Sequence, residues 1–304
     1  MIKRLDRWIF GFGSPVTLGV YRAIMGTLVF IGLLLVGADF QTWFTEGGLA
    51  PAKAAAMWEG TLPHFNLLNG VTSPEISLAF FILVVIASVL TAFGLFTRVS
   101  TIALALGIIT LHHRDPFILN GGDTMMRLSV VYLALAPCGA AFSLDRRRLE
   151  AKHKPTQDSV SLWPQRLIQV QMVLMYGTTV WHKLNGLHWI DGTASWYPTK
   201  LIEFDRFPLP QWIDLPPFVQ FFTWSTLLVE MALASLVFWK PARKWVLLCG
   251  ILLHATIEYR FNIPMFAFIC VAQYLTHYEG GEVQGWLDRT KKRLSGKEGQ
   301  IATA

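Results

Sequence analysis

Residues 76–96 read ISLAFFILVVIASVLTAFGLF, an apolar run of 21 residues without a charged side chain. Folded as a helix, such a run spans about 30 Å, which is the thickness of the hydrocarbon core of a bilayer. The whole chain of 304 residues has a similar bias, because 53% of its residues are hydrophobic and 15% are charged. Soluble domains carry about a quarter charged residues. The sequence therefore predicts an all-α, polytopic integral membrane protein that lies in a lipid bilayer.

Eight segments are apolar enough and long enough to be candidate membrane helices. The third, fifth and seventh carry polar residues toward one end. The eight predicted spans are Pro15–Val36, Ile76–Phe96, Ser100–Leu119, Thr124–Phe142, Leu167–Trp181, Pro217–Trp239, Trp245–Tyr259 and Phe261–Tyr278.

The distribution of lysine and arginine predicts the orientation of these spans. Most basic residues fall on one side of the membrane if the N-terminus is cytoplasmic, in segments 3–7, 98, 146–166, 240–244 and 289–297. Cytoplasmic loops are enriched in lysine and arginine. We therefore expect both termini in the cytoplasm. The expected organisation is a cytoplasmic N-terminal segment (1–13), a transmembrane domain (14–280) and a short cytoplasmic tail (281–304).

Composition and cysteine spacing argue against several classes of protein. The net charge is +6, but no basic stripe lies on an otherwise polar module, so we expect no nucleic-acid partner. Cys138, Cys249 and Cys270 stand singly in apolar segments. This spacing does not fit a disulfide framework, a zinc site or thioredoxin-like redox chemistry.

With this topology, the ionisable residues in the apolar spans gather at the outer face. Polar groups at membrane depth are costly and usually face a cavity or a partner, so we expect one outward-facing polar cavity. The predicted contributors are His64, His112, His113, Asn120, Asp123, Trp181, His182, Lys183, His188, Trp189, Asp191, His254, Glu258 and Arg260.

Each of these residues also has a purely structural interpretation. Lys183 is equally well explained as a side chain that extends to the membrane interface, and Trp181 and Trp189 as part of an interfacial aromatic belt. His254 and Glu258 lie four residues apart on one helix face and are compatible with a structural hydrogen bond. The stretch from Asn120 to Asp123 is typical of a turn with a helix N-cap. A zinc site of His112, His113 and His254 is a weakly supported alternative.

Two further charges lie inside predicted spans and require partners. Arg22 stands among apolar residues of the first span, and we expect an acid or a backbone carbonyl as its acceptor. Glu230 in the sixth span is the corresponding acidic case.

Three stretches, in order, spacing and membrane side, resemble a known family. They are LHHRDPFILNGGDTMMRLSVVYLALAPCGAAFSLD (111–145), YGTTVWHKLNGLHWIDGTASWY (176–197) and LLHATIEYRFNIPMF (252–266). The chain resembles the horizontally transferred transmembrane (HTTM) domain over residues 13–280. This is the membrane domain shared by vitamin K-dependent γ-glutamyl carboxylase and many bacterial proteins.

The resemblance implies a function and a set of site residues. Lys183 matches the lysine proposed as the base for vitamin K hydroquinone, and His254 matches a histidine that precedes a phenylalanine, here Phe261. The implied cofactor is reduced vitamin K or a menaquinone-type quinol, with O₂ and CO₂ as co-substrates if the chain is a carboxylase. The quinol-binding residues implied or expected nearby are His112, His113, Asn120, Trp181, His182, Trp189, Glu258 and Phe261.

The resemblance is incomplete in two places, so the function has alternatives. Gly121 follows Asn120 where the carboxylase has a histidine, and the tail after the last span is too short for a large substrate-binding domain. We expect an enzyme of the bacterial inner membrane whose cavity faces the periplasm or exterior and whose substrate is small, membrane-borne or a peptide. The alternatives are a maturation protein for a secreted peptide, of the sporulation-delaying-protein-B type, and a metal-assisted membrane oxidoreductase.

Overall fold

The computed structural model describes residues 2–49, 51, 65–208 and 210–301, and these residues are mostly helical. The longer helices are α2 (Val16–Gly37), α5 (Pro74–Phe93), α6 (Thr97–Arg114), α7 (Gly121–Leu135), α9 (Trp163–Leu184), α11 (Pro216–Ser235), α12 (Lys240–Arg260) and α14 (Gly280–Ile301). The shorter helices are α1 (Ile2–Phe10), α3 (Phe40–Phe44), α8 (Leu144–Ala151), α10 (Leu187–Ile190) and α13 (Phe266–Tyr274). Four 3₁₀ turns follow, η1 (Tyr197–Lys200), η2 (Ile202–Phe204), η3 (Gln211–Asp214) and η4 (Leu275–His277).

The described strands are two short segments. β1 (Phe12–Gly13) pairs antiparallel with β2 (Val160–Ser161), with Phe12 opposite Ser161. This pairing joins the segment before α2 to the segment before α9. The prediction of an all-α protein is confirmed for the described residues.

Every predicted span coincides with a helix, but prolines move several boundaries. α6 ends at Arg114 because Asp115 precedes Pro116, and a residue before proline is disfavoured in the helical conformation. α7 ends at Leu135, before Ala136 and Pro137, instead of at Phe142. α13 begins at Phe266, after Pro264, instead of at Phe261. α7 and α13 are therefore shorter than the hydropathy of their segments predicts.

Among the described residues, three helices are long and apolar enough to cross a bilayer by length and composition, namely α2, α5 and α11. The remaining predicted spans contain polar residues or are too short to meet the same standard. Eight crossings therefore remain a prediction. Part of the predicted outer loop between residues 37 and 75, together with its His64, lies outside the described residues.

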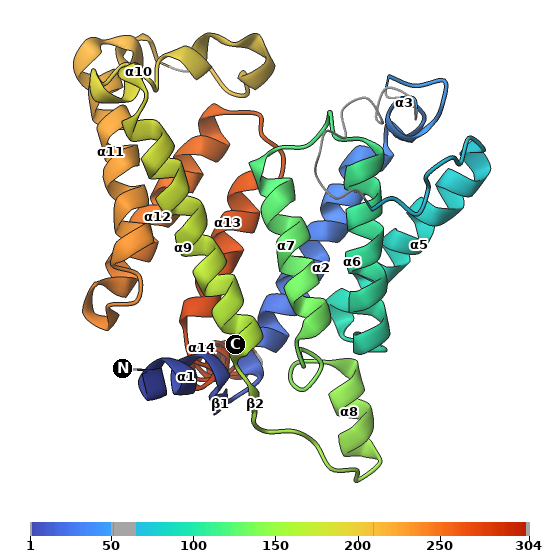
Figure 1. Cartoon of the computed structure of the whole chain (residues 1–304). Coiled ribbons are helices and arrows are strands. Elements are labelled where there is room, and N and C mark those ends of the chain that lie inside the picture. Colours follow the sequence, from blue (N-terminus) through green and yellow to red (C-terminus); the bar gives the residue numbers. More distant parts are fainter. Residues whose placement is uncertain (1, 50, 52–64, 209, 302–304) are drawn as a thin grey trace.

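The helices form two packing groups joined by α13 (Figure 1). In the first group, α2, α5, α6 and α7 enclose a core that includes Leu18, Met25, Leu104 and Val130. In the second group, α9, α11 and α12 pack around Met172, Leu233 and Leu247. α13 contacts α2 and α7 on one side and α12 on the other. Residues on α13 therefore lie between the two groups.

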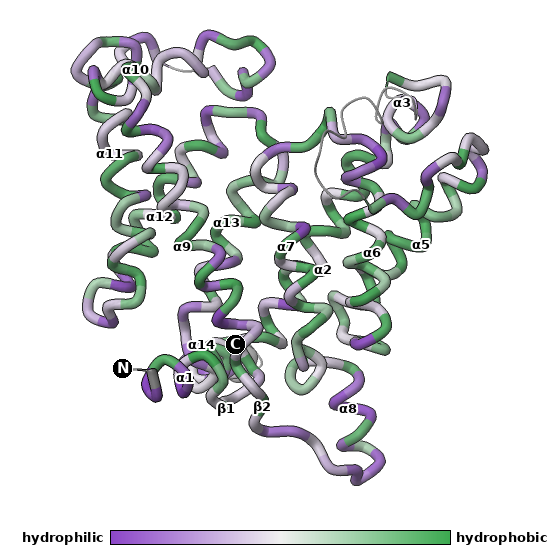
Figure 2. Tube along the Cα trace, viewed as in Figure 1, coloured by the Kyte–Doolittle hydropathy of each residue, from purple (hydrophilic) through white to green (hydrophobic). Residues whose placement is uncertain are grey.

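Polar residues lie mainly toward the two ends of the bundle. α1, α8 and α14 lie at one end, which we call the termini end, and α3 and α10 lie at the opposite end (Figure 1). Figure 2 shows hydrophobic residues along the helices between these ends and many hydrophilic residues in α1 and α8. Exposed apolar side chains on the helices, such as Leu83, Leu228 and Leu252, suit a lipid surround.

Arg22 connects three segments at the termini end of α2. Its side chain is fully buried. Nη1 donates to the carbonyls of Thr91 and Ala92, Nη2 donates to that of Phe142 at 2.6 Å, and Nε donates to that of Cys138 at 3.2 Å. These carbonyls lie near the end of α5 and in the turn after α7, where helical hydrogen bonds are missing. The expected carbonyl partner of Arg22 is confirmed.

Candidate functional site

Lys183 and Glu230 form an ion pair in the second helix group. Lys183 lies in the last turn of α9, and Glu230 lies on α11, which is apolar enough to cross a bilayer. Nζ of Lys183 is 2.5 Å from Oε1 of Glu230, and the side chains are 17% and 9% exposed. A charge in such surroundings requires an opposite charge or strong hydrogen bonds. Lys183 is therefore the partner that the sequence indicated Glu230 must have.

Trp189 closes the outer side of this pair. The chain turns back after α9, so that α10 places the Trp189 ring 4.5 Å from Nζ of Lys183. The face of an indole attracts a cation. The apolar ring also limits contact between the ammonium and water. Trp189 therefore contacts the predicted base, as expected for a residue of the site.

A hydrogen-bonded chain of three side chains lies beside the ion pair. The Tyr176 hydroxyl is 2.7 Å from Nε2 of His254 and 2.8 Å from the Tyr274 hydroxyl. All three residues are buried. Tyr176 lies on α9 seven residues before Lys183, and the two residues therefore share a face of this helix. We call Lys183, Glu230, His254, Tyr176 and Tyr274 the lysine cluster.

Two buried atoms of the lysine cluster lack a hydrogen-bond partner among the described residues. They are Oε2 of Glu230 and Nδ1 of His254. Buried polar atoms in proteins are almost always hydrogen-bonded to protein or water, and an exception requires an explanation. A small hydroxyl-bearing molecule satisfies both kinds of atom, because a hydroxyl both donates and accepts. The lysine cluster therefore has unused hydrogen-bonding capacity beside a buried cation.

His112 and Asn120 do not belong to the lysine cluster. Both line a separate cavity in the first helix group, between α2, α6 and α7. Asn120 is the N-cap of α7. Its side chain accepts from the Gly122 amide at 2.7 Å, and Asp123 accepts from the Asn120 amide at 2.8 Å. The interpretation of this stretch as a turn with a helix cap is confirmed. The residues expected around one cavity are divided between this cavity and the lysine cluster.

The other predicted site residues lie outside both places. Trp181 and His182 are exposed on α9. Glu258 forms an ion pair with Arg206, so the expected hydrogen bond with His254 is wrong. Phe261 lies next to Arg260, and the ring that contacts His254, at 5.5 Å, is that of Phe266.

His113 and Asp191, which lie in different segments, both have local structural roles. His113 is hydrogen-bonded to the backbone of Phe65. In the turn after α10, the hydroxyl and the backbone amide of Thr193 donate to Asp191 and lower its pKa below the ordinary value. Oδ2 of Asp191 lies 3.6 Å from Nδ1 of His188. The interactions of Asp191 with Thr193 and His188 stabilise the turn that places Trp189 over Lys183.

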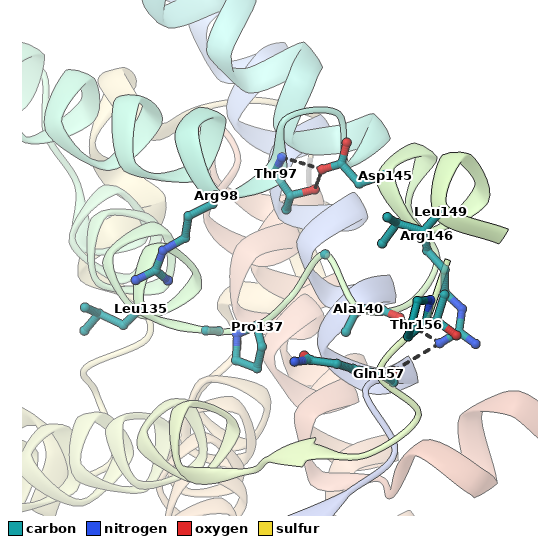
Figure 3. A pocket seen from close by; sticks show the side chains of 13 residues that line it. Thr97, Arg98, Leu135, Pro137, Ala140, Asp145, Arg146, Leu149, Thr156 and Gln157 are labelled. Atoms are coloured by element: carbon teal, nitrogen blue, oxygen red, sulfur yellow. Dashed lines mark hydrogen bonds between the residues drawn. The ribbon is translucent and has the colours of Figure 1, made fainter. Parts of the chain in front are cut away.

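The cavity drawn in Figure 3 lies at the termini end and has satisfied charges. Asp145 accepts hydrogen bonds from the Thr97 amide and hydroxyl and from the Phe96 amide. Burial opposes its ionisation, but these bonds outweigh burial and lower its pKa. Arg146 is paired with Glu150 and Asp158. The charged side chains around this cavity therefore have structural roles, as helix caps and ion pairs, and leave few groups free for catalysis.

Histidine, cysteine and acidic side chains do not come together in threes in the described ranges in a way that would hold a metal ion. His112 lies in the first helix group and His254 in the second. The zinc site considered from the sequence would need both histidines. The geometry of the described chain gives it no support.

Comparison with known proteins identifies the family. The HTTM domain matches residues 14–280. The chain belongs to the HTTM domain family. It is a membrane protein of this family, as its sequence resemblance indicated.

A bacterial relative shares part of this chain. An uncharacterized protein of Bacillus subtilis (strain 168), YitO, is 27% identical over 145 residues, or 45% of the present chain. The match covers 47% of YitO, so the chain spans about half the length of this relative. No solved structure matches.

Sequence reasoning missed the two tyrosines of the lysine cluster and the pairing of Lys183 with Glu230. A tyrosine in an apolar span looks like an ordinary core residue. The available signal for the ion pair was that Lys183, at the end of the fifth predicted span, and Glu230, in the sixth, are opposite charges in apolar surroundings that each need a partner.

We predict that Lys183 and Glu230 depend on each other for stability. Lys183→Met or Glu230→Leu alone leaves a buried charge and lowers the free energy of unfolding by about 3–5 kcal/mol. The double variant removes both charges and recovers most of that loss. Thermal unfolding of the protein in detergent measures all four forms.

The exposed pair of Lys200 and Asp214 is a matched control for this cycle. Its atoms are 2.6 Å apart, but the side chains are 43% and 44% exposed. Surface pairs contribute about 0–1 kcal/mol. Equal and additive losses at the two pairs would contradict the coupling.

Proposed function

We propose that this HTTM protein binds a membrane quinol at the lysine cluster and removes a proton from it. The supporting observation is that Oε2 of Glu230, whose other carboxylate oxygen pairs with Lys183, and Nδ1 of His254 are both buried without hydrogen-bond partners among the described residues. A quinol hydroxyl has the hydrogen-bonding groups that these atoms need. Trp189 and Phe266 supply aromatic faces for a planar ring.

Lys183 and Glu230 act as one base. The pair has no net charge, and transfer of one proton to the Glu230 carboxylate changes its net charge to +1. That proton leaves the hydroxyl oxygen, and the positive charge of the pair balances the negative charge left behind. In a chain without Glu230, the site would hold the Lys183 cation and lack the carboxylate that accepts the proton of the quinol. Glu230 is therefore as important to proton removal as Lys183.

His254 and the tyrosines orient the reacting group. The hydrogen bond between the Tyr176 hydroxyl and Nε2 of His254 fixes the His254 ring, and Tyr274 supports Tyr176 in turn. Ring nitrogens of histidine are fixed in role by the partner of the opposite nitrogen. A bound quinol would supply the reactivity toward O₂ that forms an epoxide and a strong base, which can be coupled to proton removal from a carbon acid and to its carboxylation by CO₂.

The test is formation of quinone epoxide by the purified protein with reduced menaquinone or vitamin K, O₂ and bicarbonate. We expect epoxide from the native chain, followed by mass spectrometry. Loss of the positioned base in Lys183→Ala or Glu230→Gln should lower the rate by about 10²–10⁴-fold. His254→Ala should also lower it, and Lys200→Ala, an exposed control, should not.

Two results would count against this function. Native rates in Lys183→Ala would remove the lysine from catalysis. Absence of epoxide from every quinol tested, in a folded protein, would favour a maturation protein for a secreted peptide, with the ion pair as a structural element.

The proposal includes an orientation, in which the termini end faces the cytoplasm of a bacterial inner membrane and the lysine cluster lies nearer the exterior. Basic residues of α1, α8 and α14 gather at the termini end, as expected of a cytoplasmic face.

We predict that, with Cys249 replaced by serine, a membrane-impermeant maleimide labels intact cells carrying Thr199→Cys and not those carrying Arg147→Cys. Thr199 belongs to η1, near α10, and Arg147 belongs to α8 at the termini end. Permeabilised cells, in which both variants should react, provide the control. The reverse pattern in intact cells would invert the orientation.

A further inference from the structure

The first helix group contains a cavity of about 260 Å³ that the proposed reaction does not use. α2, α6 and α7 form its walls, together with the segment before α13. Its lining is mainly apolar and includes Val29, Leu33, Ile108, Leu111, Met126 and Met265. Protein interiors are close-packed, and spaces much larger than a water molecule are rare. A cavity of this size therefore requires an explanation.

Gly32 helps to keep the space open. A Cβ at this position would meet only Cε of Met126 and Cγ of Met265, at 3.7 and 3.8 Å, which is ordinary van der Waals contact. α2 therefore presents no side chain to the cavity at Gly32. A larger residue would fit on the helix and extend into the cavity.

The polar groups of the cavity lie at one edge. Asn120 and Asp123 are occupied in capping α7. In contrast, Nδ1 of His112 is buried and has no hydrogen-bond partner in the described part of the chain. His112 is one of the residues that line the cavity, so the mainly apolar lining includes one side chain with an unused hydrogen-bonding atom.

These features describe a site for an amphiphile. Water is poorly held where most walls are apolar, because a buried water needs two to four polar partners. Small-molecule sites are mostly apolar, with a few polar groups that orient the ligand. α2 is also apolar enough to cross a bilayer, so lipid chains are the abundant apolar molecules near it. We propose that the cavity binds one hydrocarbon chain of a single-chain lipid whose head-group oxygen hydrogen-bonds to His112.

The cavity is next to the lysine cluster but separate from it. Met265 lines the cavity and has a φ of 63°, in the left-handed region that is strained for a residue other than glycine. The next residue, Phe266, has its ring 5.5 Å from that of His254. One turn of the chain therefore forms a wall of the lipid site and a wall of the lysine cluster. The lipid site stands whether or not the lysine cluster removes protons.

The test uses palmitic acid with a diazirine in its chain, photolysed with the full-length protein in nanodiscs. We expect labelled peptides from α2, α6 and α7 that contain cavity-lining residues. Gly32→Phe fills the space, and labelling of these peptides should fall about tenfold, because added bulk excludes the chain. Leu34→Phe, which adds bulk at an exposed position of the same helix, should leave labelling unchanged.

The head-group contact is tested separately with His112→Leu. This variant should lower labelling by the fatty acid and leave labelling by a diazirine alkane of equal length unchanged. Size-exclusion chromatography confirms that each variant is folded. Equal labelling of the native chain and Gly32→Phe, or labels confined to lipid-facing residues such as Leu34, would overturn the proposal. No quinol is present, so failure of the proposed reaction does not affect the result.

Discussion

The ion pair between Lys183 and Glu230 is the interaction on which the second half of the protein depends. It joins the end of α9 to the middle of α11 among apolar side chains, where neither charge is stable alone. The short α10 then brings Trp189 over the lysine, and α12 and α13 bring His254 and Tyr274 to the same place. A purely apolar contact would hold the same helices with less desolvation cost. The retention of two charges is therefore better explained by chemistry than by stability.

α13 links this site to the rest of the molecule. It packs on both helix groups, and its first turn lies between the lysine cluster and the cavity near His112. The short length of α13 follows from Pro264, which delays the start of the helix until Phe266. The irregular segment before it carries the strained Met265. A chain that continued as a helix from Phe261 would place different side chains against His254.

The sequence predicted the helical class, the position of each long helix except α14 and the partner type of Arg22, because these depend on apolar runs and on the need of buried charges for acceptors. It did not predict where helices stop next to prolines such as Pro116 and Pro264. It named Lys183 and His254 as site residues, which stays a prediction, and it treated His112 and Asn120 as part of the same cavity. The side of the membrane on which a residue lies does not tell to which of the two helix groups it belongs, because lateral position in the membrane is set by packing. The pairing of Lys183 with Glu230 likewise depends on the rotation of α9 and α11 about their axes, which a periodic apolar pattern this uniform does not specify.

Quinol binding at the lysine cluster is tested most directly by a cryo-EM map of the full chain in nanodiscs, prepared without oxygen in the presence of reduced menaquinone. We expect ring density enclosed by Lys183, Glu230 and His254, with an oxygen within hydrogen-bonding distance of the Glu230 carboxylate. A map at saturating quinol that shows Lys183 and Glu230 paired and no quinol density between them and His254 would contradict it.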